Sequence, residues 1–171
     1  MNKKGFTLVE LIAVVSIIAI IALIATPSIM TLSNNSKKEQ VISDAKKFVS
    51  DVKHKSKLID YEEFYPSKVE TSCKEICLNN SNFKDSIKTD PDGNEYDINE
   101  SCVKIIFENG KYNYYVKLAS KNEIEYKRGI SNSKEKISYV LEDELNRDTS
   151  IKYDGLINDT EEETTCINIK E

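Results

Sequence analysis

One acidic residue, Glu10, lies at the start of a run that is otherwise apolar. No other charged residue follows it until Lys37, and from residue 11 to residue 29 the only polar side chains are Ser16, Thr26 and Ser28. A carboxylate in a membrane-spanning helix costs about 2.5 to 3.5 kcal/mol and usually marks a function. Its natural partner is a cation in the same apolar layer, and residues 11–36 supply none.

Cleavage of the chain after Gly5 would supply this cation. Phe6 would then carry a free α-amine about one helical turn from Glu10. The amine and the carboxylate can pair between neighbouring copies of the chain. A buried ion pair adds little net stability, but it fixes register because the unpaired alternative is penalised. The spacing therefore predicts a pair that sets the stagger of an assembly.

The element that positions Glu10 is predicted to be one long helix from about Phe6 to about Ile59. About 20 residues at 1.5 Å per residue cover a bilayer core, so residues 6–32 are its membrane-spanning half. A secretory signal peptide is the alternative, but its apolar region is usually about 7 to 15 residues. Residues 33–60 are predicted to be an amphipathic half, since apolar residues recur there at spacings of three and four: Val41, Ala45, Phe48, Val49 and Val52. Seven lysines occupy its other faces, and we expect them to be solvated.

The first 30 residues resemble the class III signal of type IV prepilins and of the pseudopilins of type II secretion. The family pattern is a short basic leader ending in Gly, a cut before Phe, and a Glu at the fifth mature position; Gly5, Phe6 and Glu10 match it. The resemblance implies a leader of residues 1–5, cleavage and N-methylation of Phe6 by a prepilin peptidase, and neutralisation of a neighbour's amine by Glu10. Pro27 falls where many pilins carry a proline that bends the helix.

The resemblance also implies the partners and the location of the chain. The partners are other pilins and further copies of this chain in a helical filament, the peptidase, an inner-membrane assembly platform, and the lipid bilayer before assembly. The precursor would cross the cytoplasmic membrane once and the filament would be a surface pilus, with adhesion among its tasks. The expected function is a major or minor type IV pilin. The alternatives are a pseudopilin of a type II secretion or competence system, and an anchored surface-binding domain that never polymerises.

The remaining residues, 61–171, predict one small head with an antiparallel sheet. Two segments rich in β-branched and aromatic residues, 102–108 and 111–118, are joined by Asn109-Gly110, a strong hairpin signal. Packed on the long helix, they give an α+β, pilin-like fold. We also expect strands at 123–127, 151–153 and 165–169, a helix from Ser133 to Leu145 capped by Ser131 or Ser133, an acidic loop at 159–163, and an exposed connection at 67–97.

The segment from Asp90 to Tyr96 predicts a turn. Proline presets φ at its second position, and a glycine follows two residues later. The segment is similar to the Asp-Pro-x-Gly-Asn-x-Tyr motif of major pseudopilins and some pilins. Asp90, Asp92 and Asn94 also alternate like the start of a calcium loop, but residue 101 is Ser where an EF-hand needs Glu. We therefore predict no metal there.

Four cysteines, Cys73, Cys77, Cys102 and Cys166, offer thiol chemistry in the head. A domain outside the cytoplasmic membrane permits disulfides, and four cysteines allow three connectivities. Four thiolates also suit zinc. The sequence leaves two disulfides and a zinc site open, and we commit to no metal or cofactor. The resemblance adds that many pilins pair a C-terminal cysteine with an upstream one, and Cys166 occupies such a position.

Composition excludes several classes of function. A formal net charge of −5 argues against direct nucleic-acid binding. His54 is the only histidine, and with five glycines the chain has little material for phosphate-binding or cofactor loops. Because no pattern supports nucleophilic or acid–base catalysis, we do not expect an enzyme.

Overall fold

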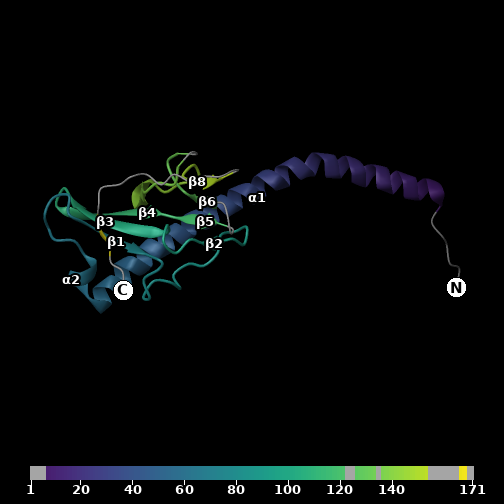
Figure 1. Ribbon diagram of the computed structural model, residues 1–171. Helices are drawn as coiled ribbons and strands as arrows, with labels where there is room; N and C mark the ends of the chain where they lie inside the picture. Colours follow the sequence, from purple (N-terminus) through teal and green to yellow (C-terminus); the bar gives the residue numbers. More distant parts are fainter. Residues whose placement is uncertain (1–6, 122–125, 134–135, 154–165, 169–171) are drawn as a thin grey trace. The chain divides into compact units, whose positions relative to one another are not determined.

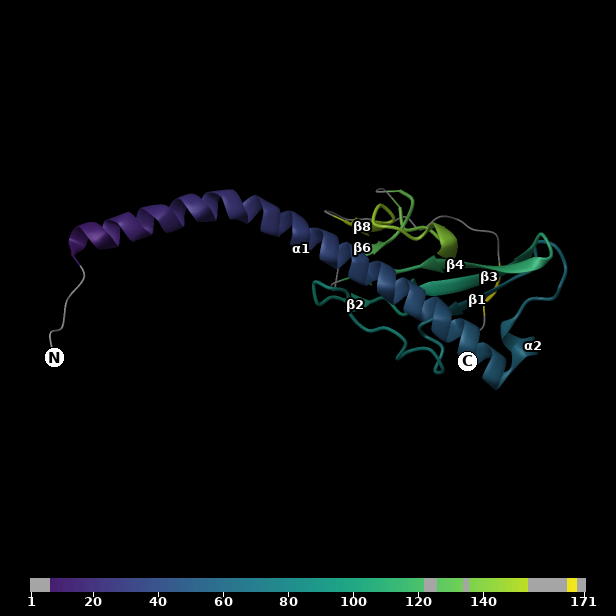
Figure 2. The same ribbon diagram turned by 180° about the vertical axis from the view of Figure 1, so that it is seen from behind.

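The computed structural model describes residues 7–121, 126–133, 136–153 and 166–168. The chain divides into two units, residues 1–36 and residues 37–171. One helix, α1 (Leu8–Ile59), contributes to both, as the sequence predicts. The second unit is an α+β arrangement, with α1 packed on two small sheets (Figures 1 and 2).

In the first unit, α1 is apolar on every side. All fifteen of its Val, Ile, Leu and Met side chains from Leu8 to Leu32 are 47–77% exposed. The helix continues through Pro27 without interruption. Since proline has no N–H, one carbonyl of the preceding turn loses its helical donor there. The predicted bend at Pro27 stays a prediction.

In the second unit, α1 buries one face in the main core. Its buried residues recur at helical spacing: Val41, Ile42, Ala45, Phe48, Val49, Val52 and Ser56. They pack with residues of the sheet such as Ile76, Val103 and Ile105. The hydroxyl of Tyr96 also donates to Asp44 Oδ2 at 3.0 Å and links the helix to a strand of the head.

The predicted solvation of the α1 lysines holds only in part. Lys37 pairs with Asp92 and Lys53 pairs with Glu142, while Lys55 donates to the carbonyl of Asn82 at 3.0 Å. The long aliphatic stems let these lysines cross the rim of the core and reach polar partners. These three lysines therefore help to hold α1 on the head.

The larger sheet has the strand order β7-β4-β3-β1-β9. The predicted hairpin is confirmed by β3 (Cys102–Glu108) and β4 (Lys111–Lys117), which pair antiparallel. Asn109 and Gly110 both have positive φ, 53° and 75°, as a tight hairpin turn of this type requires. At the edges lie two-residue strands, β7 (Val140–Leu141) and β9 (Ile167–Asn168), and β9 runs parallel to β1 (Cys73–Cys77).

The smaller sheet has the order β2-β5-β6-β8 and is antiparallel. Its strands are β2 (Glu95–Tyr96), β5 (Ala119–Lys121), β6 (Tyr126–Ile130) and β8 (Ser150–Lys152). A side chain at Gly129 would meet the carbonyl oxygen of Leu118 at 2.2 Å, so this close approach requires glycine. The expected strands at 151–153 and 165–169 are confirmed as β8 and β9, within the described residues. The acidic loop expected at 159–163 lies outside the described residues.

The predicted helix from Ser133 to Leu145 is wrong. The described part of this segment forms β7 and a short 3-10 helix, η1 (Glu142–Glu144). Its apolar residues enter two different clusters: Ile137 packs with Ile151 and Tyr153, whereas Val140 joins the main core. Pairing with the open edge of β4 therefore outweighs the local helical pattern.

Two further expectations about the head need correction. Residues 67–97 are more than an exposed connection, because β1 pairs along its whole length with β3 and Leu78 and Phe83 are buried. The third strand of the larger sheet is therefore β1. The strand expected at 123–127 begins, within the described residues, at Tyr126 and belongs to the smaller sheet.

Short α2 (Tyr61–Phe64) follows α1 directly. Asp60 caps it, accepting from the backbone N–H groups of Glu62 and Glu63 at 2.9 and 3.1 Å. Phe64 is buried against Phe83, with the ring centroids 5.7 Å apart. This turn carries the chain from the helix into the head.

Candidate functional site

Glu10 belongs to a reciprocal hydrogen-bonded cap at the start of α1. Its Oε2 accepts from the backbone N–H of Thr7 at 2.9 Å and from the Thr7 hydroxyl at 2.8 Å. The backbone N–H of Glu10 lies 3.3 Å from Thr7 Oγ1 in return. Thr7 also provides the carbonyl that accepts the first helical bond, from Leu11 at 3.2 Å. This is a capping box, with Thr7 as N-cap and Glu10 at the third helical position.

The capping box explains how the carboxylate is held in place. Helix N-termini leave backbone donors unpaired and carry a partial positive charge, so a glutamate in the first turn is favourable there. Our sequence interpretation missed this contact, although a Thr-x-x-Glu pattern before an apolar run would have identified it. An ionised carboxylate has about four acceptor positions. The two bonds from Thr7 therefore leave room for a further donor from another chain.

Three hydroxyl groups of the apolar half form hydrogen bonds within the helix itself. Ser16, Thr26 and Thr31 each donate to the carbonyl four residues earlier, at 2.8, 2.6 and 3.1 Å. Without such bonds, each hydroxyl would carry a desolvation cost in an apolar layer. The helix can therefore enter hydrocarbon or pack on other apolar helices without leaving these groups unpaired.

Among the described residues, one helix is long and apolar enough to cross a membrane. It is α1, whose most apolar stretch contains no buried residue. A cleavable signal sequence would satisfy the same criteria of length and composition. Gly5 and Phe6, the predicted cleavage and methylation positions, lie outside the described residues, so their roles stay predictions.

The four cysteines form two disulfides on the larger sheet. Cys73 pairs with Cys166, 93 residues away, and Cys77 pairs with Cys102, 25 residues away. This arrangement favours the disulfide alternative, because all four sulfurs are used and none remains as a thiolate for zinc. Cys77 and Cys102 are directly opposite each other on β1 and β3, while Cys73 links the start of β1 to the residue that precedes β9.

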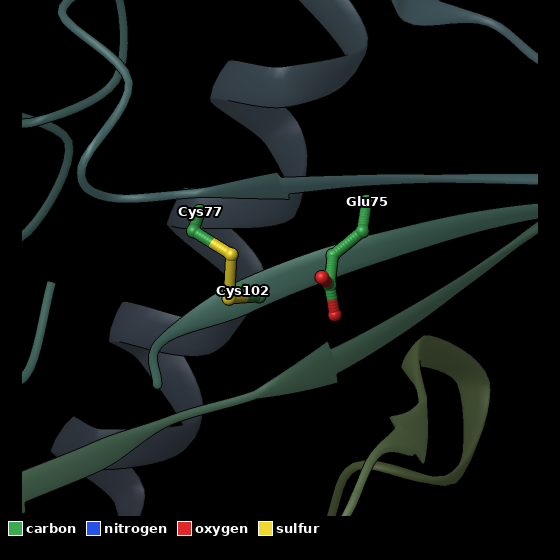
Figure 3. Close-up of side chains that lie close together, drawn as sticks. All are labelled: Glu75, Cys77 and Cys102. Atoms are coloured by element: carbon green, nitrogen blue, oxygen red, sulfur yellow. A yellow bond between two sulfur atoms is a disulfide. The ribbon is translucent and has the colours of Figure 1, made fainter. Parts of the chain in front are cut away.

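Glu75 lies beside the Cys77–Cys102 disulfide, as Figure 3 shows. All three side chains lie on the face of the sheet that points away from α1, because the intervening Ile76 is in the core. The carboxylate and the two sulfurs lie as close together as the ligands of a metal ion, and this closeness is the only resemblance to a metal site. Its sulfurs are joined to each other, however, and Glu75 accepts a hydrogen bond from the Tyr139 hydroxyl. The disulfide and this hydrogen bond therefore explain why the three side chains lie together.

The loop at Asp90 is built as the predicted turn. Asp90 Oδ1 accepts from the backbone N–H groups of Asp92 and Asn94 at 2.8 and 2.9 Å, and Oδ2 accepts from Ser120 Oγ at 2.6 Å. Asp92 contacts Lys37 and the buried Arg128. The Lys37 ammonium, helped by Arg128 and opposed by partial burial, lowers the pKa of Asp92. These carboxylates therefore already have protein donors as partners.

Residues 1–26 match the family model described as the prokaryotic N-terminal methylation motif. No curated protein and no solved structure matches the chain. The matched range includes Gly5, Phe6 and Glu10 and ends one residue before Pro27. The chain therefore carries a class III N-terminal methylation signal on a long apolar helix, which is consistent with a membrane-anchored precursor of the type IV pilin or pseudopilin kind.

Proposed function

We propose that this chain is a type IV pilin subunit, major or minor, that polymerises through its N-terminal helix. The observation that carries the proposal is the combination of a capped Glu10 with a helix half that exposes apolar side chains on every side. Prepilin peptidase cuts between Gly5 and Phe6 and methylates Phe6. The mature subunit then leaves the bilayer at an inner-membrane assembly platform and joins a surface filament.

Burial of the apolar helix halves drives assembly in this proposal. The side chains exposed between Leu8 and Leu32 are covered by lipid before assembly and by neighbouring helices afterwards. Transfer from lipid to protein brings little hydrophobic gain, so close packing and polar pairs decide which neighbour fits. The amine of Phe6 on one subunit and Glu10 of the next form such a pair and set the stagger.

A pseudopilin of a type II secretion or competence system is the second candidate. It is favoured by the Asp90–Tyr96 turn, which is similar to a motif of major pseudopilins and is fully built here. Deleting the gene in the source cell distinguishes the two. Loss of surface filaments supports the pilin, whereas loss of protein secretion or DNA uptake without loss of surface filaments supports the pseudopilin.

We infer that the chain acts as a structural protein, not as an enzyme. Proteins of the pilin kind are filament components, and the methylation motif is the part of this chain that matches a known family. The unusual residue of the apolar layer, Glu10, is engaged in a cap and has an assembly role in this proposal.

The experiment that tests the proposal replaces Glu10 by glutamine and by alanine in the source cell. Glutamine still completes a capping box but removes the charge, whereas alanine removes both. We expect both variants to insert in the membrane with both disulfides formed, and neither to appear in sheared filaments viewed by electron microscopy. The control Ser16→Ala, which removes a hydroxyl that bonds only within its own helix, should assemble normally. Normal filaments from Glu10→Gln would refute the pairing mechanism.

A further inference from the structure

A cavity of about 460 Å³ lies where α2 meets the start of β1 and the beginning of β4. Its size is in the usual range for small-molecule sites. Three tyrosines form the aromatic part of the lining: Tyr61, the largely buried Tyr65, and Tyr112. We propose that this cavity, named here the tyrosine pocket, binds a pyranose sugar that carries a carboxylate, as found in acidic polysaccharides. The proposal is independent of filament assembly.

The aromatic rings form an open corner. Tyr61 stacks on Tyr65 with the centroids 4.4 Å apart, and Tyr112 stands at 80° to Tyr61 with the centroids 6.5 Å apart. Tyr61 is 42% exposed, whereas Tyr65 is 3% exposed. One face of the Tyr61 ring is therefore covered by Tyr65, and Tyr61 still lines the pocket. The C–H groups on one side of a pyranose ring pack well on such an aromatic face.

The corner is held in place before any ligand arrives. The hydroxyls of Tyr65 and Tyr114 lie 3.0 Å apart, and the Tyr112 hydroxyl donates to the carbonyl of Pro66 at 3.2 Å. Phe107 supports Tyr112 from β3, with the centroids 5.2 Å apart. A site whose rings are fixed by packing and hydrogen bonds loses little conformational entropy on binding.

Polar side chains complete the lining and favour a sugar over a purely apolar guest. Glu62, Ser67, Lys68 and Lys74 all line the pocket. A pyranose ring presents several hydroxyls that need donors and acceptors, whereas the proline rings of a polyproline peptide need few. The mixture of aromatic faces and four polar groups therefore matches a carbohydrate better than a proline-rich segment.

The charges favour an acidic sugar. Two lysines face one glutamate in the lining, so the pocket has a positive excess. Lys74 donates to the carbonyls of Glu62 and Glu63, the first at 2.6 Å, which fixes its ammonium beside α2. An ammonium has three donors, and these contacts use two of them. Lys74 and the exposed Lys68 can thus receive a carboxylate at the rim.

The test measures sugar binding to the full chain in lipid nanodiscs, because detergents with sugar headgroups would compete. The probes are methyl glucuronoside and the neutral methyl glucoside, followed by saturation-transfer NMR with empty nanodiscs as background. We expect millimolar binding of the glucuronoside, and about two- to threefold weaker binding of the glucoside, as befits a charge contact at a rim. Absence of transfer to the glucuronoside at about 50 mM, or equal binding of both sugars, would overturn the proposal.

Variants locate the binding in the pocket. Tyr61→Ala should weaken the glucuronoside about fivefold, since an aromatic contact is removed, whereas Tyr61→Trp keeps a ring and should preserve binding. Lys68→Ala should bring the two sugars to similar affinity. The matched controls are Leu58→Ala and Lys57→Ala, which alter exposed residues outside the pocket and should change nothing. Unchanged binding in Tyr61→Ala, or capture of a proline-rich peptide in place of the sugar, contradicts the assignment.

Discussion

The two halves of α1 are built on opposite hydrophobic patterns. From Leu8 to Leu32 the helix is apolar on all sides and its large side chains are exposed. From Val41 to Ser56 it is apolar along one face, and that face is buried in the head. A helix that is apolar all round needs an apolar environment, whereas a one-sided helix needs one partner surface. One half of the helix therefore matches an apolar environment, and the other half matches the core of the head.

The two units also differ in what stabilises them. The first unit relies on bonds within its own helix, such as those from Thr7 to Glu10 and from Ser16 to Ile12. The second unit has a core of buried side chains closed by two disulfides. Changes in the first unit should therefore affect assembly, and changes in the second should affect the stability of the head.

The largest expected effect on the head comes from removing the long-range disulfide. Cys73→Ala with Cys166→Ala opens a loop of 93 residues and should lower the free energy of unfolding by about 4 to 5 kcal/mol. The matched double variant, Cys77→Ala with Cys102→Ala, opens only 25 residues and should cost about 3.5 kcal/mol. Guanidinium unfolding followed by near-UV circular dichroism measures both. Equal losses would show that loop entropy does not govern these disulfides.

Truncating a core residue of α1 should have the next largest effect. Phe48 is fully buried, so Phe48→Ala should cost about 3 to 4 kcal/mol through lost burial and the remaining cavity. Ile18→Ala, a similar truncation at a 60% exposed position of the first unit, should leave the unfolding of the head unchanged. The same guanidinium titration compares them. A loss of head stability in Ile18→Ala would break the separation between the two units.

A smaller effect is expected at the ion pairs around Asp92. Asp92→Asn leaves the Arg128 guanidinium buried without its carboxylate and should cost about 2 kcal/mol, which is less than the roughly 3 to 5 kcal/mol of a fully buried pair because Asp92 is 26% exposed. The pKa of Asp92 is lowered, so its stabilisation is present above the ordinary carboxyl pKa of about 4 and is lost as the pH falls further.

Acid unfolding checks the sign of this effect. The loss of stability below about pH 4 should be shallower in Asp92→Asn than in the natural chain. Asp44 acts in the opposite sense, because burial raises its pKa despite the Tyr96 hydroxyl. Asp44 therefore cannot produce the loss at low pH. Identical acid slopes in the variant and the natural chain would remove Asp92 from this account.

The long helix and the hairpin could be predicted from local sequence patterns. The wrong predictions concern segments whose structure depends on pairing with distant parts of the chain. The long helix and the Asn109-Gly110 hairpin were predictable, because apolar periodicity and turn chemistry act over a few residues. The segment from Ser133 to Leu145 was mistaken for a helix, since its apolar residues serve two clusters and a sheet edge that lie far away in the sequence. The strand β1 was missed because it forms by pairing with β3, which lies far from it in the sequence.

The candidate site divides in the same way. The methylation motif was evident in the sequence, because its residues are contiguous. The cap between Thr7 and Glu10 could also have been predicted from the sequence, because the Thr-x-x-Glu pattern spans only four residues. The choice among cysteine connectivities was not, since Cys73 meets Cys166 only after the sheet has brought β1 and β9 together. The tyrosine pocket likewise combines residues of α2, β1 and β4.

The most direct test of the central claim is the mass of the native protein from its source cell, measured intact and after N-terminal sequencing by mass spectrometry. The account predicts a chain that begins at Phe6, carries a methyl group on its α-amine, and gains the mass of four hydrogens on reduction of two disulfides. A chain that keeps Met1, or one that is cut near Ala25 as a secretory signal would be, would contradict prepilin processing and the assembly mechanism built on Glu10.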